Sequence, residues 1–321
     1  MDIKSLVGNA EKVWLSTHIG ADGDGLGSEF AFFHALQKIG KNVRIVHNDP
    51  TPIRYKFLTD QIQVADSSTL DAAEFSENDL CLIFDTHDPK LCQPLISKLL
   101  LKKVKIIFVD HHVVLKTDTE NAVYHIDETA SCTGELTLDL IESLGIVPDA
   151  KIAGCLYASL IFDTQSFKTM RDPVRILEMA KKLVIAGADH KSIHRQLFEN
   201  WTLNKFNYLS KLIKAVIYRE DTAIINITKA DLKEFNLNTD EVSDIVDLFM
   251  GLRSMNICVV IREENENFFK LSFRSRKTEI LSWAREFGGG GHLYSAGAWV
   301  KGKETEILAK INSLIDRFHE N

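Results

Sequence analysis

The sequence of 321 residues lacks the features that mark several common classes of protein. Its five cysteines form no CxxC pair, so neither a zinc ribbon nor a disulfide framework is indicated, and reduced thiols in a cytoplasm are expected. The longest apolar stretch, residues 152–162, is shorter than the ~20 residues of a membrane-spanning helix, and the N-terminus has no signal-peptide pattern. The sequence therefore predicts a soluble, cytoplasmic protein with no membrane partner.

Positive charge is also scarce. The chain has 38 Lys and Arg against 45 Asp and Glu, a net charge of −7, which argues against a protein that binds duplex DNA through bulk electrostatics. The excess is uneven, because residues 1–190 carry 19 basic and 27 acidic side chains, whereas residues 191–321 carry 19 and 18. With 45% hydrophobic residues and only six prolines the chain is typical of a globular protein, and its length suggests about two domains.

The first part of the chain alternates short apolar runs with helical patterns. Nearly continuous apolar runs, such as residues 80–84 and 104–109, are typical of strands buried on both faces of a parallel sheet. The alternation predicts an α/β fold in which residues 1–189 form a doubly wound, mainly parallel sheet. Strands are expected at residues 13–17, 43–46, 80–84 and 104–109, and helices at 28–39, 95–101, 132–144 and 152–161.

The second part is expected to contain a connector and a smaller domain. Residues 190–216 are poor in Gly and Pro and predict a helical connector. Residues 217–321 then predict a smaller C-terminal α/β domain. Its strands are expected at residues 222–227, 256–261 and 268–273, and its helices at 241–252, 279–287 and 304–318.

Acidic and histidine side chains follow several of the predicted elements. In an α/β sheet the carboxyl ends of parallel strands meet at one edge, where ligands bind. No Lys or Arg stands among these residues, so packed carboxylates would repel one another, and a pair of divalent cations would remove that conflict. An Asp and His ligand set without sulfur suits Mn²⁺ or a similar metal. The residues are His18, Asp22, Asp24, Asp85, Asp110, His111, His112 and Asp163.

Single members of this set commonly have simpler roles, and only their combination favours a metal site. A single Asp after a strand is usually a turn or helix cap, and a His pair is more often structural than a ligand. An EF-hand that starts at Asp22 would need an oxygen ligand at its fifth position and Glu at its twelfth, where this sequence has Leu26 and Phe33. The GxxxxGK pattern of a phosphate-binding loop does not occur.

Taken in order, these motifs resemble those of the DHH phosphoesterases. The matching residues are His18-xxx-Asp22-x-Asp24-xx-Gly27-Ser28, Asp85, Asp110-His111-His112 and Asp163. Residues 273–276 (Phe-Arg-Ser-Arg) and 287–292 (Phe-Gly-Gly-Gly-Gly-His), followed by Ser-Ala-Gly-Ala, resemble the DHH-associated C-terminal domain of the nanoRNase and pAp phosphatase branch. The sequence departs from the common pattern at Ala21 and Leu293, where Pro is frequent.

The resemblance implies roles for the individual residues. His18 and Asp22 would hold one metal ion, Asp24, His111 and Asp163 the other, and Asp85 would bridge the two. Asp110 and His112 would act beside the metals, by orienting His111 or by donating a proton to the leaving oxygen. The glycines at 23, 25 and 27 are expected to let the loop fold back so that Asp22 and Asp24 reach different metals, with Ser28 capping the next helix.

A second set of residues is expected to bind the substrate. Consecutive glycines expose backbone N–H groups that suit a phosphate, and Arg274 adds a two-pronged contact. Between residues 270 and 292 there are five basic and two acidic side chains, so this window is locally positive. Ser131 and Thr133 could also contact the substrate, but their expected role is to cap a helix. The substrate-binding residues expected are Arg274, Arg276, Gly289, Gly290, Gly291 and His292.

The resemblance implies a metal-dependent phosphoesterase that acts on short oligoribonucleotides, linear dinucleotides such as pApA, and 3′-phosphoadenosine 5′-phosphate (pAp). A hydroxide bridging two Mn²⁺ ions, or Mg²⁺ or Co²⁺ in their place, would attack the phosphorus. The partners expected are short RNA and nucleotides but not duplex DNA, and a homodimer is an open option. The alternatives are an inorganic pyrophosphatase or cyclic-dinucleotide phosphodiesterase of the same superfamily, or a non-catalytic nucleotide sensor.

Overall fold

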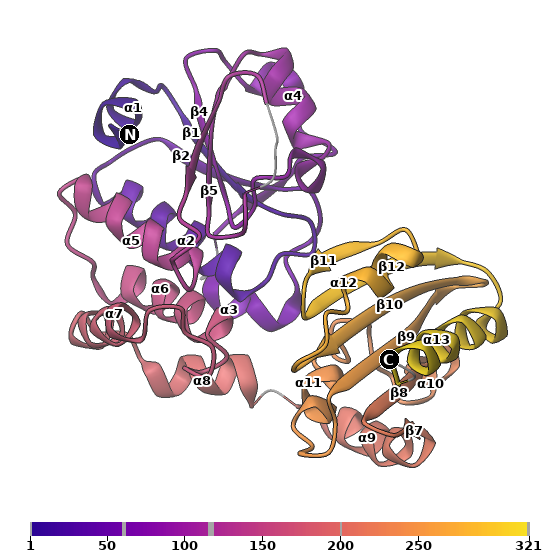
Figure 1. Cartoon of the computed structure of the whole chain (residues 1–321). Helices are drawn as coiled ribbons and strands as arrows, with labels where there is room; N and C mark the ends of the chain where they lie inside the picture. Colours follow the sequence, from indigo (N-terminus) through magenta and orange to yellow (C-terminus); the bar gives the residue numbers. More distant parts are fainter. Residues whose placement is uncertain (1, 60–61, 115–118, 200, 320–321) are drawn as a thin grey trace. The chain divides into compact units, whose positions relative to one another are not determined.

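The computed structural model describes residues 2–59, 62–114, 119–199 and 201–319. The chain divides into two compact units, Met1–Asn200 and Trp201–Asn321, each built around its own sheet (Figure 1). None of the helices in these ranges is long and apolar enough to cross a membrane.

The first unit contains a six-stranded sheet in the order β3-β2-β1-β4-β5-β6, with every neighbouring pair parallel. Strand order therefore reverses between β1 and β4, the place where ligands bind in open α/β sheets. The strands are β1 (Val13–Thr17), β2 (Val43–His47), β3 (Val64–Asp66), β4 (Leu80–Phe84), β5 (Lys105–Asp110) and β6 (Ala122–Ile126).

Helices cover both faces of this sheet, as the continuous apolar runs of its central strands predict. Val13 and Leu15 of β1 pack into a core with α2, α5 and α6, whereas Trp14 packs into a second core with α4 on the opposite face. The predicted doubly wound fold is confirmed. The helices are α1 (Ile3–Asn9), α2 (Gly23–Lys38), α3 (Lys56–Thr59), α4 (Leu95–Leu101), α5 (Thr133–Ser143), α6 (Ala150–Asp163), α7 (Pro173–Ile185) and α8 (His190–Phe198). Three short 3-10 helices are η1 (Ile53–Tyr55), η2 (Ala72–Glu74) and η3 (Pro89–Cys92).

The second unit contains another six-stranded sheet, ordered β11-β12-β10-β9-β8-β7, in which only β8 and β9 are parallel. One face carries a core with α12 and α13, and the other a core with α9, α10 and α11. The strands are β7 (Ile217–Arg219), β8 (Thr222–Ile227), β9 (Ile257–Asn265), β10 (Phe268–Ser275), β11 (Gly290–His292) and β12 (Ser295–Lys301). The helices are α9 (Leu203–Ala215), α10 (Lys229–Glu234), α11 (Ile245–Met250), α12 (Leu281–Glu286) and α13 (Glu304–His319).

Several elements differ from the sequence-based expectation. The stretch 190–216, expected to connect two domains, holds two helices, of which α8 lies in the first unit and α9 in the second. Strands β3, β6, β7, β11 and β12 carry no prediction, and α2 begins at Gly23 rather than at Ser28.

Candidate active site

The candidate site lies at the carboxyl edge of the first unit's sheet. Strands β1, β4 and β5 are neighbours, and each is followed at once by a residue of the predicted site: His18, Asp85 and His111. The start of α2 adds Asp22 and Asp24, and the last residue of α6 is Asp163. Carboxylate and imidazole groups from segments that are distant in sequence thus lie together at the carboxyl edge of this sheet.

The Gly-rich loop after β1 is shorter than the sequence suggests, because helix α2 starts within it. Asp22 is the N-cap, and its Oδ1 accepts hydrogen bonds from the backbone N–H groups of Asp24 (3.0 Å) and Gly25 (3.3 Å). Ser28 is therefore buried inside α2 and does not cap it. Gly27 serves close packing, since a Cβ there would lie 2.6 Å from a backbone carbonyl oxygen of α6.

Asp24 is fully buried and is held by hydrogen bonds from helix α5 and helix α6. Its carboxylate accepts from the backbone N–H groups of Thr133 (2.8 Å) and Gly134 (3.3 Å) and from the Ser159 hydroxyl (2.5 Å). Burial nevertheless raises the pKa of Asp24 to about 6, and the nearby carboxylate of Asp22 adds to the rise. The carboxylate is fixed in place but is costly to ionise.

Asp85 has an unusual backbone conformation. Its φ of 64° lies in the left-handed region, which Asp tolerates better than most residues but which still stores strain. The side chain is buried and accepts a hydrogen bond from Thr133 Oγ1 (3.0 Å). Burial, followed by the charges of Asp24, Asp22 and Asp163, raises the pKa of Asp85. The turn therefore brings the Asp85 carboxylate close to those of Asp24, Asp22 and Asp163.

Two imidazole rings face these carboxylates through their Nε2 atoms. The His18 Nδ1 lies 3.0 Å from the Ile19 carbonyl oxygen, and its Nε2 lies 3.6 Å from Asp85 Oδ2. The His111 Nδ1 lies 3.3 Å from the Ala130 carbonyl oxygen. A carbonyl oxygen only accepts, so the contact of His18 favours the Nδ1–H tautomer, which leaves its Nε2 lone pair directed at Asp85. The His111 Nδ1 also lies 3.4 Å from Arg171 Nη1, which only donates, so its two contacts favour opposite tautomers.

The surroundings of His111 Nε2 test whether a metal ion fits. This buried atom has no hydrogen-bond partner among the described residues, yet it lies 3.5 Å from Asp24 Oδ2, 3.7 Å from Asp85 Oδ1 and 3.4 Å from Asp163 Oδ2. Burial, and then the positive charge of His112, lowers the pKa of His111 to about 4, so the ring is neutral near pH 7. A neutral imidazole nitrogen among carboxylate oxygens is a donor set that a divalent cation prefers.

Three overlapping groups have ligand atoms within 4.8 Å of one another. They cover the six ligand positions expected from the sequence, with His112 in addition. The groups are His18, Asp22 and Asp85; Asp24, His111 and Asp163; and Asp85, His111 and His112. Each group offers ligand atoms close enough together to hold a metal ion.

Asp110 belongs to none of these groups but is hydrogen-bonded to His112, which belongs to one of them. Asp110 Oδ1 accepts from His112 Nδ1 (2.7 Å), and its Oδ2 accepts from His87 Nδ1 (2.5 Å). Burial alone would raise the pKa of Asp110, but the hydrogen bonds and charge of His112 outweigh it, so the pKa is lowered. In turn Asp110 overcomes the effect of burial on His112 and raises its pKa, so His112 keeps a proton to a higher pH.

Several residues at the site carry no prediction for this role. Thr133, expected to cap a helix, instead donates its hydroxyl to Asp85, and Ser159 donates to Asp24. His87 is hydrogen-bonded to Asp110, and Arg171 donates to the carbonyl oxygen of His111. Only His87 has a signal in the sequence, since it stands two residues after Asp85, at the end of a predicted strand.

The substrate-binding residues expected in the second unit lie around strands β10 and β11. Arg274 of β10 is half-buried and donates to the Phe273 carbonyl oxygen (3.2 Å), and burial lowers its pKa. Arg276 donates to the carbonyl oxygens of Met250 and Leu252, so it satisfies groups at the end of α11.

The glycine run of the second unit forms part of an edge strand. Gly290 and Gly291 pair with β12, and Gly291 has a φ of 135°. A Cβ at Gly289 or at Gly291 would clash with the backbone of β12, at 2.1 Å and 2.6 Å respectively, so close pairing explains these glycines. The side chain of His292 lies outside the described part of the structure.

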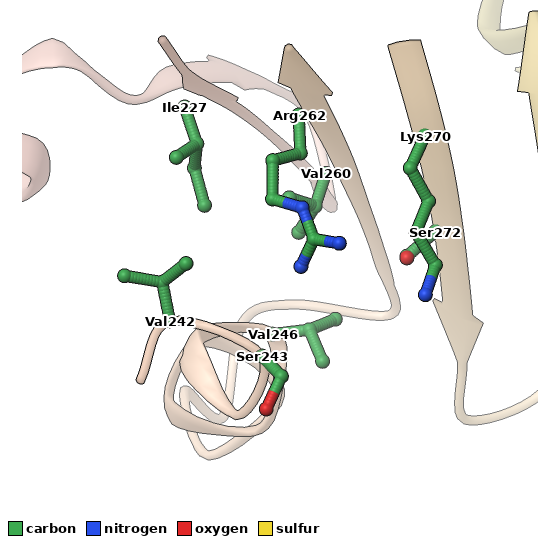
Figure 2. A pocket seen from close by; sticks show the side chains of 8 residues that line it. All are labelled: Ile227, Val242, Ser243, Val246, Val260, Arg262, Lys270 and Ser272. Atoms are coloured by element: carbon green, nitrogen blue, oxygen red, sulfur yellow. The ribbon is translucent and has the colours of Figure 1, made fainter. Parts of the chain in front are cut away.

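A small pocket on the second unit gathers further basic groups. Figure 2 shows Arg262 extending from β9 toward the segment that carries Ser243, with Lys270 on the neighbouring strand β10. Ser272 also lines the pocket, and Arg262 pairs with Glu264 at 2.5 Å. Burial, followed by the charge of Arg262, lowers the pKa of Lys270. Glu264 thus balances the charge of Arg262, whereas Lys270 lies on the same strand as Arg274.

Comparison with known proteins identifies both units. Residues 12–160 match the DHH family, N-terminal domain, and residues 220–318 match the DHHA1 domain. An uncharacterized protein of Mycoplasma pneumoniae is 27% identical and covers 95% of this chain and 90% of its own. The bifunctional oligoribonuclease and PAP phosphatase NrnA of Thermus thermophilus is 24% identical over 92% of this chain and 86% of its own.

A solved structure has the same fold. The exopolyphosphatase-related protein of Bacteroides fragilis superposes with a TM-score of 0.89, covering 99% of this chain and 96% of its own, at 20% identity. At this identity the likeness concerns the fold alone.

Proposed function

Because the chain belongs to the DHH family of phosphoesterases and also carries a DHHA1 domain, we propose that it hydrolyses short oligoribonucleotides, linear dinucleotides of the pApA type, and pAp. The observation that carries the proposal is the buried His111 Nε2, which lies within 3.7 Å of three carboxylates and has no hydrogen-bond partner among the described residues. The name of the Thermus thermophilus relative supports the substrate class.

The proposed metal ligands follow the geometry of the groups described above. His18 and Asp22 would hold one ion, Asp24, His111 and Asp163 a second, and Asp85 would lie between them. An oxygen-rich set with two imidazoles and no thiolate suits Mn²⁺, with Mg²⁺ or Co²⁺ as substitutes. When bound, a pair of such ions activates water and stabilises the charge that develops on the phosphoryl oxygens.

The remaining residues of the site have proposed roles of their own. His112 has a raised pKa and a half-exposed side chain, so it is suited to give a proton to the leaving oxygen. Asp110 positions His112 through the 2.7 Å hydrogen bond and stabilises its charged form. Thr133 restricts Asp85 to one orientation, because its hydroxyl occupies Oδ1.

In the second unit, we assign the binding of the nucleotide phosphate to Arg274 and to the segment Gly289–His292. Burial lowers the pKa of the half-buried Arg274 guanidinium, and the charge of Asp247 offsets part of that effect, so the side chain keeps its positive charge. Since Arg276 serves the end of α11, we expect its replacement to affect stability more than substrate affinity.

The test is a comparison of substrates with the full chain. Protein supplied with Mn²⁺ is incubated with pAp, pApA, a 24-residue RNA, a cyclic dinucleotide and pyrophosphate, and products are separated by chromatography, with EDTA as the control. We expect rapid Mn²⁺-dependent release of phosphate or AMP from pAp and pApA and slow attack on the 24-mer. Preferred cleavage of pyrophosphate or of the cyclic dinucleotide would contradict the proposal and favour a pyrophosphatase or a cyclic-dinucleotide phosphodiesterase. If no substrate is cleaved in a metal-dependent way, a non-catalytic nucleotide sensor would be favoured.

A further inference from the structure

A pocket of about 280 Å³ opens beside the proposed metal ligands in the first unit. Asp163, one of those ligands, forms part of its wall. The remaining lining residues are Ser131, Thr169, Met170 and Arg171. Of these five residues Arg171 alone brings a positive charge, although neither the sequence motifs nor the proposed function gives it a task.

The Arg171 side chain is exposed but firmly held. Its Nη1 donates to the carbonyl oxygens of His111 (2.7 Å), Glu128 (2.8 Å) and Ala130 (2.7 Å), and its backbone N–H donates to Ser131 Oγ (2.9 Å). All these side-chain contacts use one nitrogen. Within the described ranges Nε and Nη2 donate to no further group, so the edge of the guanidinium that these two nitrogens form is available to a ligand.

The charge of Arg171 is not matched by a nearby carboxylate. No Asp or Glu oxygen of the described residues lies within 4.0 Å of its guanidinium. Burial, followed by the charges of Asp24 and Asp22, raises the pKa of Asp163, and the charge of Arg171 offsets only part of that rise. The next arginine, Arg175, is the opposite case, because it pairs with Asp127 (3.1 Å), Glu135 (2.6 Å) and Asp139 (3.3 Å). One of two neighbouring arginines is thus neutralised by protein groups, and the other is left positive at the edge of a pocket.

We infer that Arg171 binds the phosphoryl group that is hydrolysed, through the guanidinium edge that the three carbonyl oxygens leave unused. A planar guanidinium contacts two oxygens of a phosphate at once, and a side chain already fixed by its Nη1 loses little conformational freedom on binding. The pocket shares Asp163 with the proposed metal ligands, so a phosphate there lies next to the ions. This inference rests on the proposed function.

A purely structural role for Arg171 predicts different behaviour. In that case the side chain would only connect the segment around Glu128 and Ala130 to the backbone of His111 through hydrogen bonds. A lysine could form some of these hydrogen bonds and would keep the charge, but it cannot present a second planar edge to a phosphate. Comparison of Arg171→Lys with Arg171→Gln therefore separates the two roles.

The experiment measures binding apart from catalysis. The full chain with Mn²⁺ is titrated calorimetrically with inorganic phosphate and with AMP, in the wild type and in Arg171→Gln, Arg171→Lys and Arg175→Lys, and bound manganese and the unfolding temperature are recorded for each. Arg171→Gln is expected to raise both dissociation constants about tenfold to a hundredfold, and Arg171→Lys several-fold, without loss of manganese. Arg175→Lys should stay within about twofold of the wild type.

Two results would overturn the inference. One is phosphate affinity in Arg171→Gln within about twofold of the wild type. The second is a fall in phosphate affinity in Arg171→Gln that accompanies loss of manganese or of thermal stability, together with wild-type affinity in Arg171→Lys. That pattern would show that Arg171 only stabilises the local structure. If the wild type binds phosphate through Arg171 but cleaves neither pAp nor pApA, the proposed function fails, and only the phosphate-binding part of the inference stands.

Discussion

Replacement of Asp24 by Asn should make the metal-free protein more stable near neutral pH, although it removes a proposed metal ligand. Asp24 is fully buried, and its pKa is about 6 in the folded chain against 3.8 for an unperturbed Asp. A difference of this size corresponds to about 3 kcal/mol of folding free energy that is lost when the carboxyl ionises. Asn has almost the same shape and cannot ionise.

The sign of the effect follows from the protons bound. Between pH 3.8 and 6 the folded chain holds a proton on Asp24 that the unfolded chain has released, so stability falls as pH rises through this range. The cost is about 3 kcal/mol at pH 7.5 and about 1 kcal/mol at pH 4.5. The Asn amide loses one hydrogen bond, because it cannot accept from both Thr133 and Gly134, at about 1 kcal/mol. The expected net gain for Asp24→Asn is therefore about 2 kcal/mol at pH 7.5 and about zero at pH 4.5.

Thermal unfolding in EDTA, followed by circular dichroism at the two pH values, measures this difference. For a unit of 200 residues, 2 kcal/mol corresponds to a rise of about 4–8 °C at pH 7.5. Saturating Mn²⁺ provides the control, since it should stabilise the wild type strongly and Asp24→Asn weakly, which reverses their order. A variant that is less stable than the wild type in EDTA at pH 7.5, or that shifts equally at both pH values, would refute the reasoning.

Three further substitutions test individual parts of the site and of its frame. Thr133→Val removes the hydrogen bond to Asp85 and should weaken Mn²⁺ binding about tenfold to a hundredfold by calorimetry, whereas Thr133→Ser should keep it within a few-fold. His112→Gln should lower kcat on pAp by about a hundredfold while elemental analysis finds the same manganese content; loss of the metal instead would make His112 a ligand. Gly27→Ala should destabilise the fold by about 1–3 kcal/mol in denaturant unfolding, because its Cβ meets helix α6, whereas Gly8→Ala, with open space around it, should not.

The core of the first unit could be predicted because its physical signals are local. Strands buried on both faces must be apolar throughout, and residues 80–84 and 106–109 satisfy this requirement. Parallel strands end at a common edge, so residues that directly follow them are brought together whatever the loops do. That rule predicts His18, Asp85 and His111 at one site, and they lie within a few ångströms of each other.

The elements that escape prediction have weak or absent local signals. Strand β6 (Ala122–Ile126) is only half-buried along its length, so it shows no apolar run. Strand β11 includes Gly290 and Gly291, which have little intrinsic preference for strands, and its conformation depends on pairing with β12. The start of α2 at Gly23 is not predicted, because the motif around Asp22 is interpreted as a metal-binding loop. In the structure Asp22 is also the N-cap of this helix.

The supporting hydrogen bonds could not be predicted either, for a different reason. Thr133 and Ser159 lie more than 100 residues from Asp24, and a hydroxyl residue in a helix usually has no partner of this kind. Arg171 likewise reaches a segment about 40 residues away. Contacts of this range depend on the packing of α2 against α5 and α6, which a single sequence does not encode in any local pattern.

The distribution of charge around the site is consistent with the metal binding proposed for it. A Lys or Arg among Asp24, Asp85 and Asp163 would lower their raised pKa values, but it would also occupy the space and the charge that a cation needs. The first turn of α5 meets both requirements. Its N–H groups stabilise the Asp24 carboxylate with partial charges and leave it able to bind an ion. The full positive charge of Arg171 lies at the edge of the pocket that Asp163 helps to line. In that position it would contact the phosphate of the proposed substrate without taking the place of a metal ion.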